Sequence, residues 1–189
     1  DRAGTPYIPL DPQKVAAIYV SEQPETIEMT DAADEGSRRI SQHLMAFLRK
    51  EVAKGKLPPT LLPMEIGLGG IPTAFLKELG DSEFENLEFY SAVLNDGIVD
   101  LMARGKVRAA SGTGFFLSPR GEKNLLQNLE EYRKRVVLRP VEISDCPEVI
   151  TRLGVWALNG AIEADIYGNV NSSHIMDGDV VSGVGGRAS

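Results

Sequence analysis

The sequence predicts an α/β fold in which a mostly parallel β-sheet is flanked by helices. Two observations predict it. Short apolar runs alternate along the chain with segments whose apolar residues recur at helical spacing, and glycines and prolines separate the two kinds of segment. Because parallel strands are joined by crossover helices, this alternation is typical of a parallel sheet. The chain has 189 residues, 42% hydrophobic and 25% charged, which is enough for one domain with its own core.

The first predicted elements are a strand at residues 15–20 and a helix from about residue 34 to 54. The strand is the apolar run VAAIYV, which a polar stretch follows. Gly55 ends the helix, and two nearby prolines prevent it from resuming. The apolar residues of the helix fall at spacings that place them on one face: Ile40, Leu44, Phe47, Leu48 and Val52.

Strand–loop–helix units follow. The segment MEIGLGG, at residues 64–70, is a strand that runs into glycines, and Pro72 opens a helix that reaches about residue 79. The remaining predicted elements are strands at 87–93, 107–110, 136–138 and 162–166, and helices at 97–103, about 122–134 and 147–153. Ligands of such sheets bind where loops leave the carboxyl ends of strands. The loops of interest are therefore residues 67–70, 91–97, 111–118, 144–147 and 168–174.

Composition excludes several function classes. The formal net charge of −7 disfavours a surface that binds nucleic acid. No window approaches the roughly 18 apolar residues of a membrane span, and no signal peptide opens the chain, so we expect a protein of the cytoplasm. The single cysteine, Cys146, cannot form an internal disulfide. With only His43 and His174 it makes a thin ligand set, and we expect no metal.

Four features have both a structural and a functional interpretation. The glycines of residues 67–70 follow a strand and open a helix, so their amides could face a ligand, although a tight turn with close packing is the favoured interpretation. Cys146 and His174 are interpreted as a buried inert thiol and a hydrogen-bonded structural histidine. Glu65 lies in an otherwise apolar strand, where a carboxylate must be paired, protonated or directed into a cleft, and both interpretations stay open.

Taken together, several segments resemble the acetyl-CoA hydrolase and CoA-transferase family, which includes succinyl-CoA:acetate and 4-hydroxybutyrate CoA-transferases. Each motif is weak, but their order and spacing are specific. The segments are DRAGTPYIPL, LPPTLLPMEIGLGG, ENLEFYSAVLNDGIVDLMARGKV, SGTGFFLSPRG, VVLRPVEISDCPEVITRLG, AIEADIYGNVNSSHIM and the terminal GVGG.

The resemblance implies that residues 1–189 form part of the family's C-terminal domain in a two-domain, usually dimeric enzyme that acts on acyl-CoA. The N-terminal domain would then lie on a partner chain or outside this segment, in a heteromer or a homodimer. The chain lacks an initiator Met and ends in a glycine-rich stretch at residues 182–189, which agrees with a subunit or fragment. Coenzyme A, as the acyl-CoA substrate, is the implied ligand.

The resemblance also assigns roles to individual positions. Family members attack the thioester with a glutamate in a Y-S-E-V-like motif, and Ala92 occupies that position in YSAV here, so the nucleophile is missing. Asp145 stands where the family has an asparagine that helps bind the oxyanion, and Glu65 stands where it usually has a glutamine. Gly185 and Gly186 match the loop that donates a backbone amide to the oxyanion, although Arg187 departs from the usual continuation. The other candidate substrate-binding residues are Gly67, Gly69 and Gly70.

Together these positions predict an acyl-CoA-binding enzyme part that no longer performs glutamyl-CoA exchange and runs a decarboxylase or lyase-like reaction instead. Glu65 and Asp145 are its candidate acid and base, because a carboxyl group in such a pocket has a raised pKa and can move protons. Two alternatives stay open. The chain is an ordinary transferase or hydrolase in which a glutamate has been replaced by Ala92, or it is a non-catalytic subunit that stabilises an active partner.

Overall fold

A five-stranded parallel sheet forms the centre of the computed structural model, which describes residues 10–23, 32–175 and 178–180. The strand order is β6-β4-β2-β1-β7, and each neighbouring pair runs parallel. The predicted fold class is therefore confirmed. The strands are β1 (Met64–Ile66), β2 (Leu87–Tyr90), β4 (Val107–Gly112), β6 (Val136–Leu138) and β7 (Trp156–Leu158).

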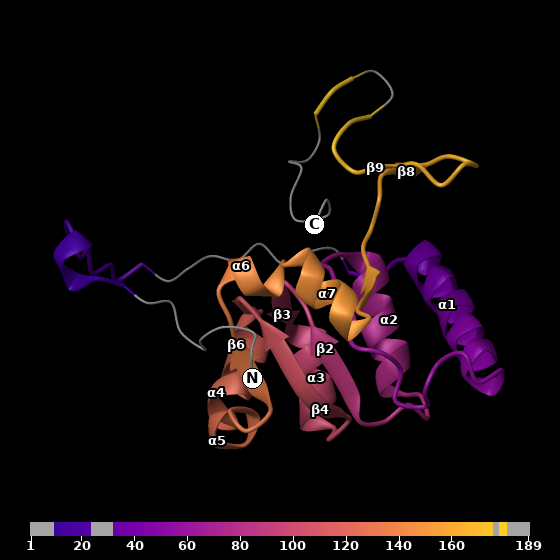
Figure 1. Ribbon diagram of the computed structural model, residues 1–189, viewed down its shortest axis with the longest axis horizontal. Helices are drawn as coiled ribbons and strands as arrows, with labels where there is room; N and C mark the ends of the chain where they lie inside the picture. Colours follow the sequence, from indigo (N-terminus) through magenta and orange to yellow (C-terminus); the bar gives the residue numbers. More distant parts are fainter. Residues whose placement is uncertain (1–9, 24–31, 176–177, 181–189) are drawn as a thin grey trace.

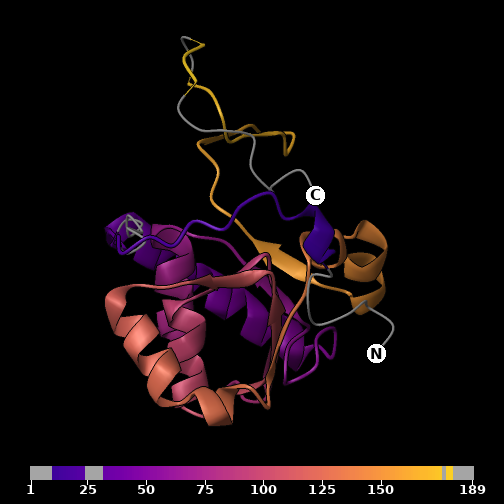
Figure 2. The ribbon, with the colours of Figure 1, turned by 90° about the vertical axis from the view of Figure 1, so that its left-hand side faces the viewer.

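Helices cover both faces of this sheet (Figures 1 and 2). On one face lie α2 (Gly70–Gly80) and α3 (Asp96–Ala103), with α1 (Glu35–Ala53) packed on the outer side of α2 and α4 (Pro119–Gln127) packed on α3. The short helices α6 (Val141–Ser144) and α7 (Pro147–Leu153) lie on the other face. Buried side chains from the sheet and from α2 and α3 form the core, among them Met64, Ile66, Phe75, Leu79, Leu87, Phe89, Ile98 and Val99.

Helix α1 confirms the helix predicted from residue 34, and Asp34 caps it by accepting a hydrogen bond from Ser37 N at 2.7 Å. Its buried stripe differs from the apolar face expected. Ile40 and Phe47 are 48% and 54% exposed, whereas Ser37 and Ser41 are buried. The physical reason is close helix packing, because small serines let α1 approach α2. A Cβ on Gly70, the first residue of α2, would lie only 2.8 Å from Ser37 Oγ.

The strand predicted at residues 15–20 is wrong. This segment follows a short 3-10 helix, Pro12–Lys14, and has no strand, and Ile18 and Tyr19 are 82% and 90% exposed. A β-strand needs a neighbour for its backbone groups, and no described strand pairs with these residues.

Three further predictions need correction. The strand expected at 87–93 is interrupted after Tyr90, and β3 (Val93–Asn95) instead pairs with the unpredicted β5 (Gly114–Phe116). The helix expected at 122–134 divides into α4 and α5 (Leu129–Tyr132), because the Asn128 side chain donates to the Asn124 carbonyl and competes with the helix backbone. Strand β8 (Glu163–Ala164) is shorter than the predicted 162–166 and pairs with β9 (Val170–Asn171) in a hairpin that projects from the domain (Figure 1).

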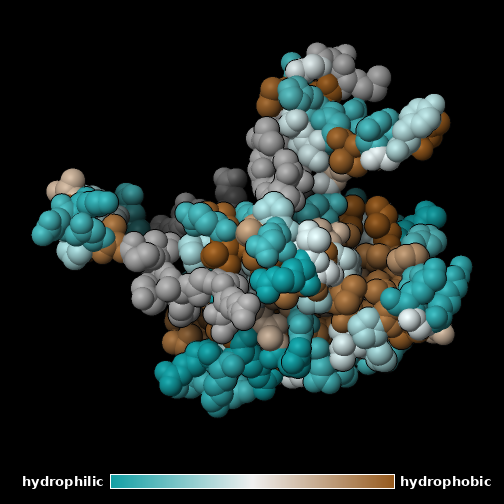
Figure 3. Space-filling model, viewed as in Figure 1, coloured by the Kyte–Doolittle hydropathy of each residue, from teal (hydrophilic) through white to brown (hydrophobic). Residues whose placement is uncertain are grey.

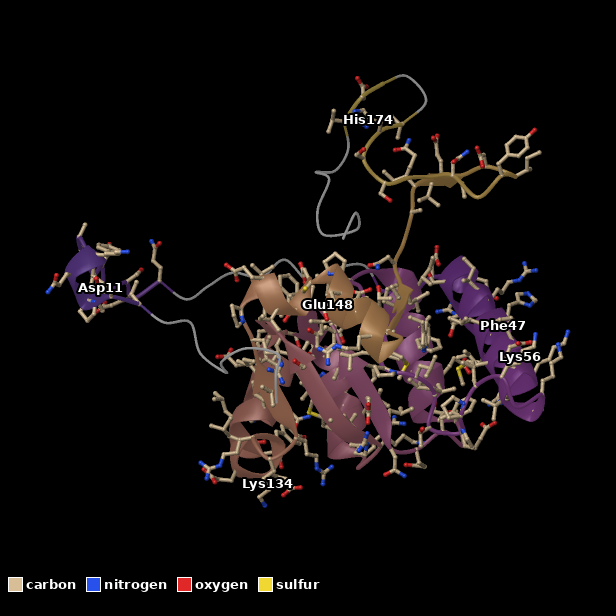
Figure 4. All side chains as sticks on the ribbon, viewed as in Figure 1. Asp11, Phe47, Lys56, Lys134, Glu148 and His174 are labelled. Carbon is tan, nitrogen blue, oxygen red and sulfur yellow. The ribbon has the colours of Figure 1, made fainter. Side chains whose placement is uncertain are left out.

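The surface of the domain is partly apolar. Figure 3 shows exposed apolar atoms on the side of the domain where α1 and α2 lie, and Figure 4 labels Phe47 on the outer side of α1. Within the described ranges, no helix combines the length and the apolar character needed to cross a bilayer.

Candidate functional site

The candidate site lies where the direction of chain winding changes across the sheet. The chain leaves β1 through α2 on one face to reach β2, and it enters β7, on the other side of β1, through α6 and α7 on the opposite face. Adjacent strands whose connections lie on opposite faces leave a crevice at their carboxyl ends, and this is where open α/β sheets bind ligands.

Glu65 is the carboxylate nearest this change of direction. It pairs in register with Ala157 of β7, and its neighbour Met64 pairs with Phe89, which places Glu65 and Tyr90 on the same face of the sheet. Glu65 Oε2 accepts a hydrogen bond from Asn159 Nδ2 at 2.7 Å. Burial raises the pKa of the Glu65 carboxyl above its ordinary value and the charge of Asp145 raises it further, while the Asn159 hydrogen bond opposes both. The group is therefore suited to carry a proton.

Asp145 reaches the site from α6, whose C-terminal end it caps. The Tyr90 hydroxyl donates to the Ile143 carbonyl at 2.6 Å and so attaches α6 to the sheet. The pKa of Tyr90 is raised, first by burial, then by Cys146 and Asp145, while Arg139 and Arg152 lower it. The two carboxyl groups named from the sequence, Glu65 and Asp145, thus lie close enough to interact electrostatically.

Ala92 lies two residues beyond the end of β2 and is half-buried. Its carbonyl accepts hydrogen bonds from Thr113 N at 2.9 Å and from Thr113 Oγ1 at 2.6 Å. The preceding Ser91 is buried, and its Oγ contacts both the N and the O of Ile66 at 3.3 and 3.4 Å. Position 92 is therefore held at the carboxyl edge of the sheet, next to the end of β1.

The three glycines after β1 differ in what surrounds them. A Cβ on Gly67 would overlap Asn159 Oδ1, and a Cβ on Gly70 would press on Ser37, so both are needed for close packing. This agrees with the tight turn favoured from the sequence. Gly69 has a φ of +119°, a conformation that favours glycine, with open space around it, and it caps α2 without a side-chain hydrogen bond.

A cavity of about 480 Å³ lies between α2, α3 and the start of α4, and Gly69 and Asn95 are part of its wall. Two arginines of its wall are already paired with carboxylates. Arg120 forms two hydrogen bonds with Asp100, at 3.0 and 2.9 Å, and Arg104 binds Asp81 at 2.8 Å. The cavity lies on the face opposite Glu65 and Asp145.

Of the other residues singled out from the sequence, Cys146 borders this cluster, next to Asp145 and near Tyr90, and the rest lie apart from it or outside the described residues. His174 is on the projecting arm, where its Nδ1 lies 2.8 Å from Ser173 Oγ (Figure 4). Cys146 is half-buried and precedes α7. Gly185 and Gly186 lie outside the described residues. In the part of the chain that the structure describes, no three His, Cys, Asp or Glu side chains are placed to hold a metal ion.

Sequence reasoning missed Asn159 as a site residue. It follows β7, which was not predicted, and it is 94 residues from Glu65 in the chain. Nothing local to Asn159 indicates that a carboxylate lies beside it.

Comparison with known proteins gives one matching family model, described as the acetyl-CoA hydrolase/transferase C-terminal domain, over residues 121–189. The succinyl-CoA:acetate CoA-transferase of Clostridium kluyveri is 40% identical over 187 residues, which cover 98% of this chain and 35% of that protein. The acetyl-CoA hydrolase of Yarrowia lipolytica is 39% identical over 98% of this chain and 35% of its own length. The propanoyl-CoA:succinate CoA transferase of Escherichia coli is 37% identical over 98% of this chain and 38% of its own length. The chain thus spans between 35% and 38% of these relatives.

Two solved structures have the same fold. RipA from Yersinia pestis superposes with a TM-score of 0.61 at 23% identity, over 82% of this chain and 34% of that one. A 4-hydroxybutyrate CoA-transferase from Porphyromonas gingivalis gives a TM-score of 0.58 at 19% identity, over 77% of this chain and 36% of that one. At these identities the likeness shows the fold alone.

Proposed function

Because the chain belongs to the acetyl-CoA hydrolase and CoA-transferase family, as part of its C-terminal domain, we propose that it helps bind acyl-CoA in a larger enzyme whose reaction is no longer glutamyl-CoA exchange. The observation that carries the proposal is the pair of carboxyl groups, Glu65 and Asp145, at the sheet edge where Ala92 also lies.

Two substitutions argue against the usual exchange. The methyl group of Ala92 has no atom that can attack a thioester, so the covalent intermediate of the exchange cannot form at this position. An ionised Asp145 repels a developing oxyanion and does not donate a hydrogen bond to it. Each change removes one requirement of the family's reaction, and both fall at one edge of the sheet.

The two carboxyl groups, Glu65 and Asp145, suit acid–base chemistry. An acyl-CoA that carries a carboxylate on the carbon next to the thioester carbonyl loses CO2 to leave an enolate; the enolate must take up one proton, and Glu65 in its acid form is the proposed donor. In a lyase-like step Asp145 would remove a proton while Glu65 protonates the leaving group. We assign the thioester oxygen to backbone amides, with Gly185 and Gly186 retained as donors from the resemblance.

We propose that a second part of the protein covers exposed apolar surface of this domain. Large apolar side chains are exposed on α1, in residues 10–23 and in the β8–β9 hairpin, which is unusual for an isolated domain. They include Ile18, Tyr19, Phe47, Ile166 and Tyr167. We propose that an N-terminal CoA-transferase domain, on the same chain or on a partner, covers part of this surface. Its presence in the purified assembly can be checked by mass spectrometry.

The function is tested with Glu65→Gln and Asp145→Asn in the full-length protein or assembly. With a panel of acyl-CoA thioesters, CO2 release, CoA release and acyl transfer to acetate are measured separately. We expect each variant to lose on the order of 10²–10⁴-fold in turnover, as is typical when a general acid or base is removed. Glu148→Gln is the control, because Glu148 is exposed on α7 (Figure 4) and is expected to leave turnover unchanged. Unchanged turnover in both site variants would remove their catalytic role and favour the non-catalytic subunit.

The ordinary-transferase alternative has its own test. If Ala92 replaces the nucleophile of an otherwise normal enzyme, Ala92→Glu should produce acyl transfer to acetate or succinate. We expect no transfer from this single change, because Asp145 still opposes the oxyanion. Robust transfer by the Ala92→Glu protein would contradict the proposed divergence.

A further inference from the structure

We infer that Asn159 is a positioning residue that holds the carboxyl group of Glu65, and that position 67 lacks a side chain because the Asn159 amide occupies that space. The inference rests on the proposed function only for the role of Glu65 in a reaction. The arrangement of the three residues stands on the geometry of β1 and β7.

Strand pairing fixes the backbones of these residues relative to one another. Ile66 pairs with Leu158, and Gly67 N donates to the Leu158 carbonyl at 3.0 Å. Gly67 and Asn159 are the next residues of the two strands, so their backbones lie side by side. The Asn159 amide then lies between the two strand ends. Its Nδ2 donates to Glu65 Oε2 at 2.7 Å, and its Oδ1 lies where a Cβ of residue 67 would be.

The hydrogen bond determines which Glu65 oxygen is available for chemistry. Because Oε2 accepts from an amide N–H, the proton of the acid form is placed on Oε1. A glutamate side chain has several rotatable bonds, and a reacting carboxyl needs a fixed direction to be effective. Asn159 supplies that direction from outside the reacting group, which is why it is a positioning residue.

The hydrogen bond also affects the charge state of Glu65. A donor to a carboxylate favours its ionised form, so the Asn159 bond lowers the pKa of Glu65 against burial and the charge of Asp145. The titratable and charged groups around this region are Asp145 from the end of α6, Tyr90 from β2, and, near Tyr90, Arg139, Cys146 and Arg152. Without the Asn159 donor, nothing opposes the rise in the Glu65 pKa that burial and the charge of Asp145 cause.

The experiment is an infrared titration of the full-length protein labelled with ¹³C-carboxyl glutamate, in which the Glu65 band is identified by its loss in Glu65→Gln. In Asn159→Ala we expect the Glu65 titration midpoint to move to higher pH. Asn159→Asp, which keeps the shape of the side chain, is expected to move it in the same direction and further, because it adds a negative charge. An unmoved midpoint in both variants overturns the inference.

A double-mutant cycle tests the role of Gly67. Gly67→Ala should displace the Asn159 amide and raise the Glu65 midpoint, whereas the same change in an Asn159→Ala background should add nothing. Gly160→Ala is the matched control, because a Cβ there meets open space. Equal shifts from Gly67→Ala in both backgrounds would overturn the account of Gly67.

The rate profile separates this inference from the proposed function. If the alkaline limb of the pH–turnover profile, where Glu65 loses its proton, moves with the infrared midpoint, both are supported. If the midpoint rises but turnover keeps its pH dependence, the positioning of Glu65 stands and its role as the catalytic acid is overturned.

Discussion

Replacing Tyr90 with Phe is expected to loosen the helix that leads to Asp145. Helix α6 has four residues, Val141–Ser144, and no side-chain hydrogen bond at its N-cap, so it is too short to be stable by itself. The Tyr90 hydroxyl attaches it to β2 through the Ile143 carbonyl at 2.6 Å. Phe keeps the buried ring and removes only this bond.

The size of the effect follows from the lost hydrogen bond. Its net contribution is about 1 kcal/mol, and a difference of that size changes an opening equilibrium about 5-fold. Hydrogen–deuterium exchange of the full-length protein, read on peptides covering residues 141–153, should therefore become about 5-fold faster in Tyr90→Phe. Turnover with the acyl-CoA substrate should fall as well, because Asp145 loses its fixed position.

A second tyrosine provides the matched control. Tyr132 is 3% exposed, compared with 7% for Tyr90, and its hydroxyl donates to Asn124 Oδ1 at 3.1 Å, away from Glu65 and Asp145. Tyr132→Phe should speed exchange around α4 and α5 and leave residues 141–153 unchanged. The reasoning is refuted if Tyr90→Phe leaves exchange of α6 unaltered, or if both variants loosen the same peptides.

Two further predictions concern stability. The pKa of Glu65 is raised in the folded state above its ordinary value near 4.5, so folding stability falls as pH rises from that value through the folded pKa. In urea denaturation across pH, Glu65→Gln should therefore be more stable than the wild type above this window and equal to it below about pH 4; a gain that persists at low pH would contradict the linkage. Gly121→Ala should cost about 2 kcal/mol, because its Cβ would overlap Asp96, which accepts from Ser118 N at 2.9 Å and from Ser118 Oγ at 2.7 Å. Gly114→Ala, where a Cβ meets open space, is the control and should change stability by less than about 0.5 kcal/mol; equal losses would reject the role of Asp96.

Elements with strong local signals could be predicted from the sequence. Strand β6 and helix α7 have the predicted bounds, and α7 begins with Pro147 and ends before Gly154, whose φ is +67°. Such start and stop signals lie within a few residues of the element that they delimit. The equally short strands β5 and β7 were missed, because what makes them strands is parallel pairing with β3 and β1, which lie far from them in the chain.

At residues 15–20 the composition predicts a strand that the structure does not contain. The run VAAIYV has the residues of a buried strand, yet Ile18 and Tyr19 are exposed because no described strand lies beside them. Strand propensity describes how a residue fits a pleated, half-buried surface, and that surface has to be supplied by another segment.

By itself, the sequence determined that this chain is α/β, that it resembles a family of CoA-dependent enzymes, and that Glu65 is a carboxylate in an apolar strand that must be paired, protonated or directed into a cleft. Only the tertiary structure gave Glu65 its hydrogen-bond partner. The return of the chain to β7, on the far side of β1, places Asn159 against Glu65 across 94 residues. The order of strands in a sheet depends on long-range pairing and not on local periodicity, so no local pattern contains this contact.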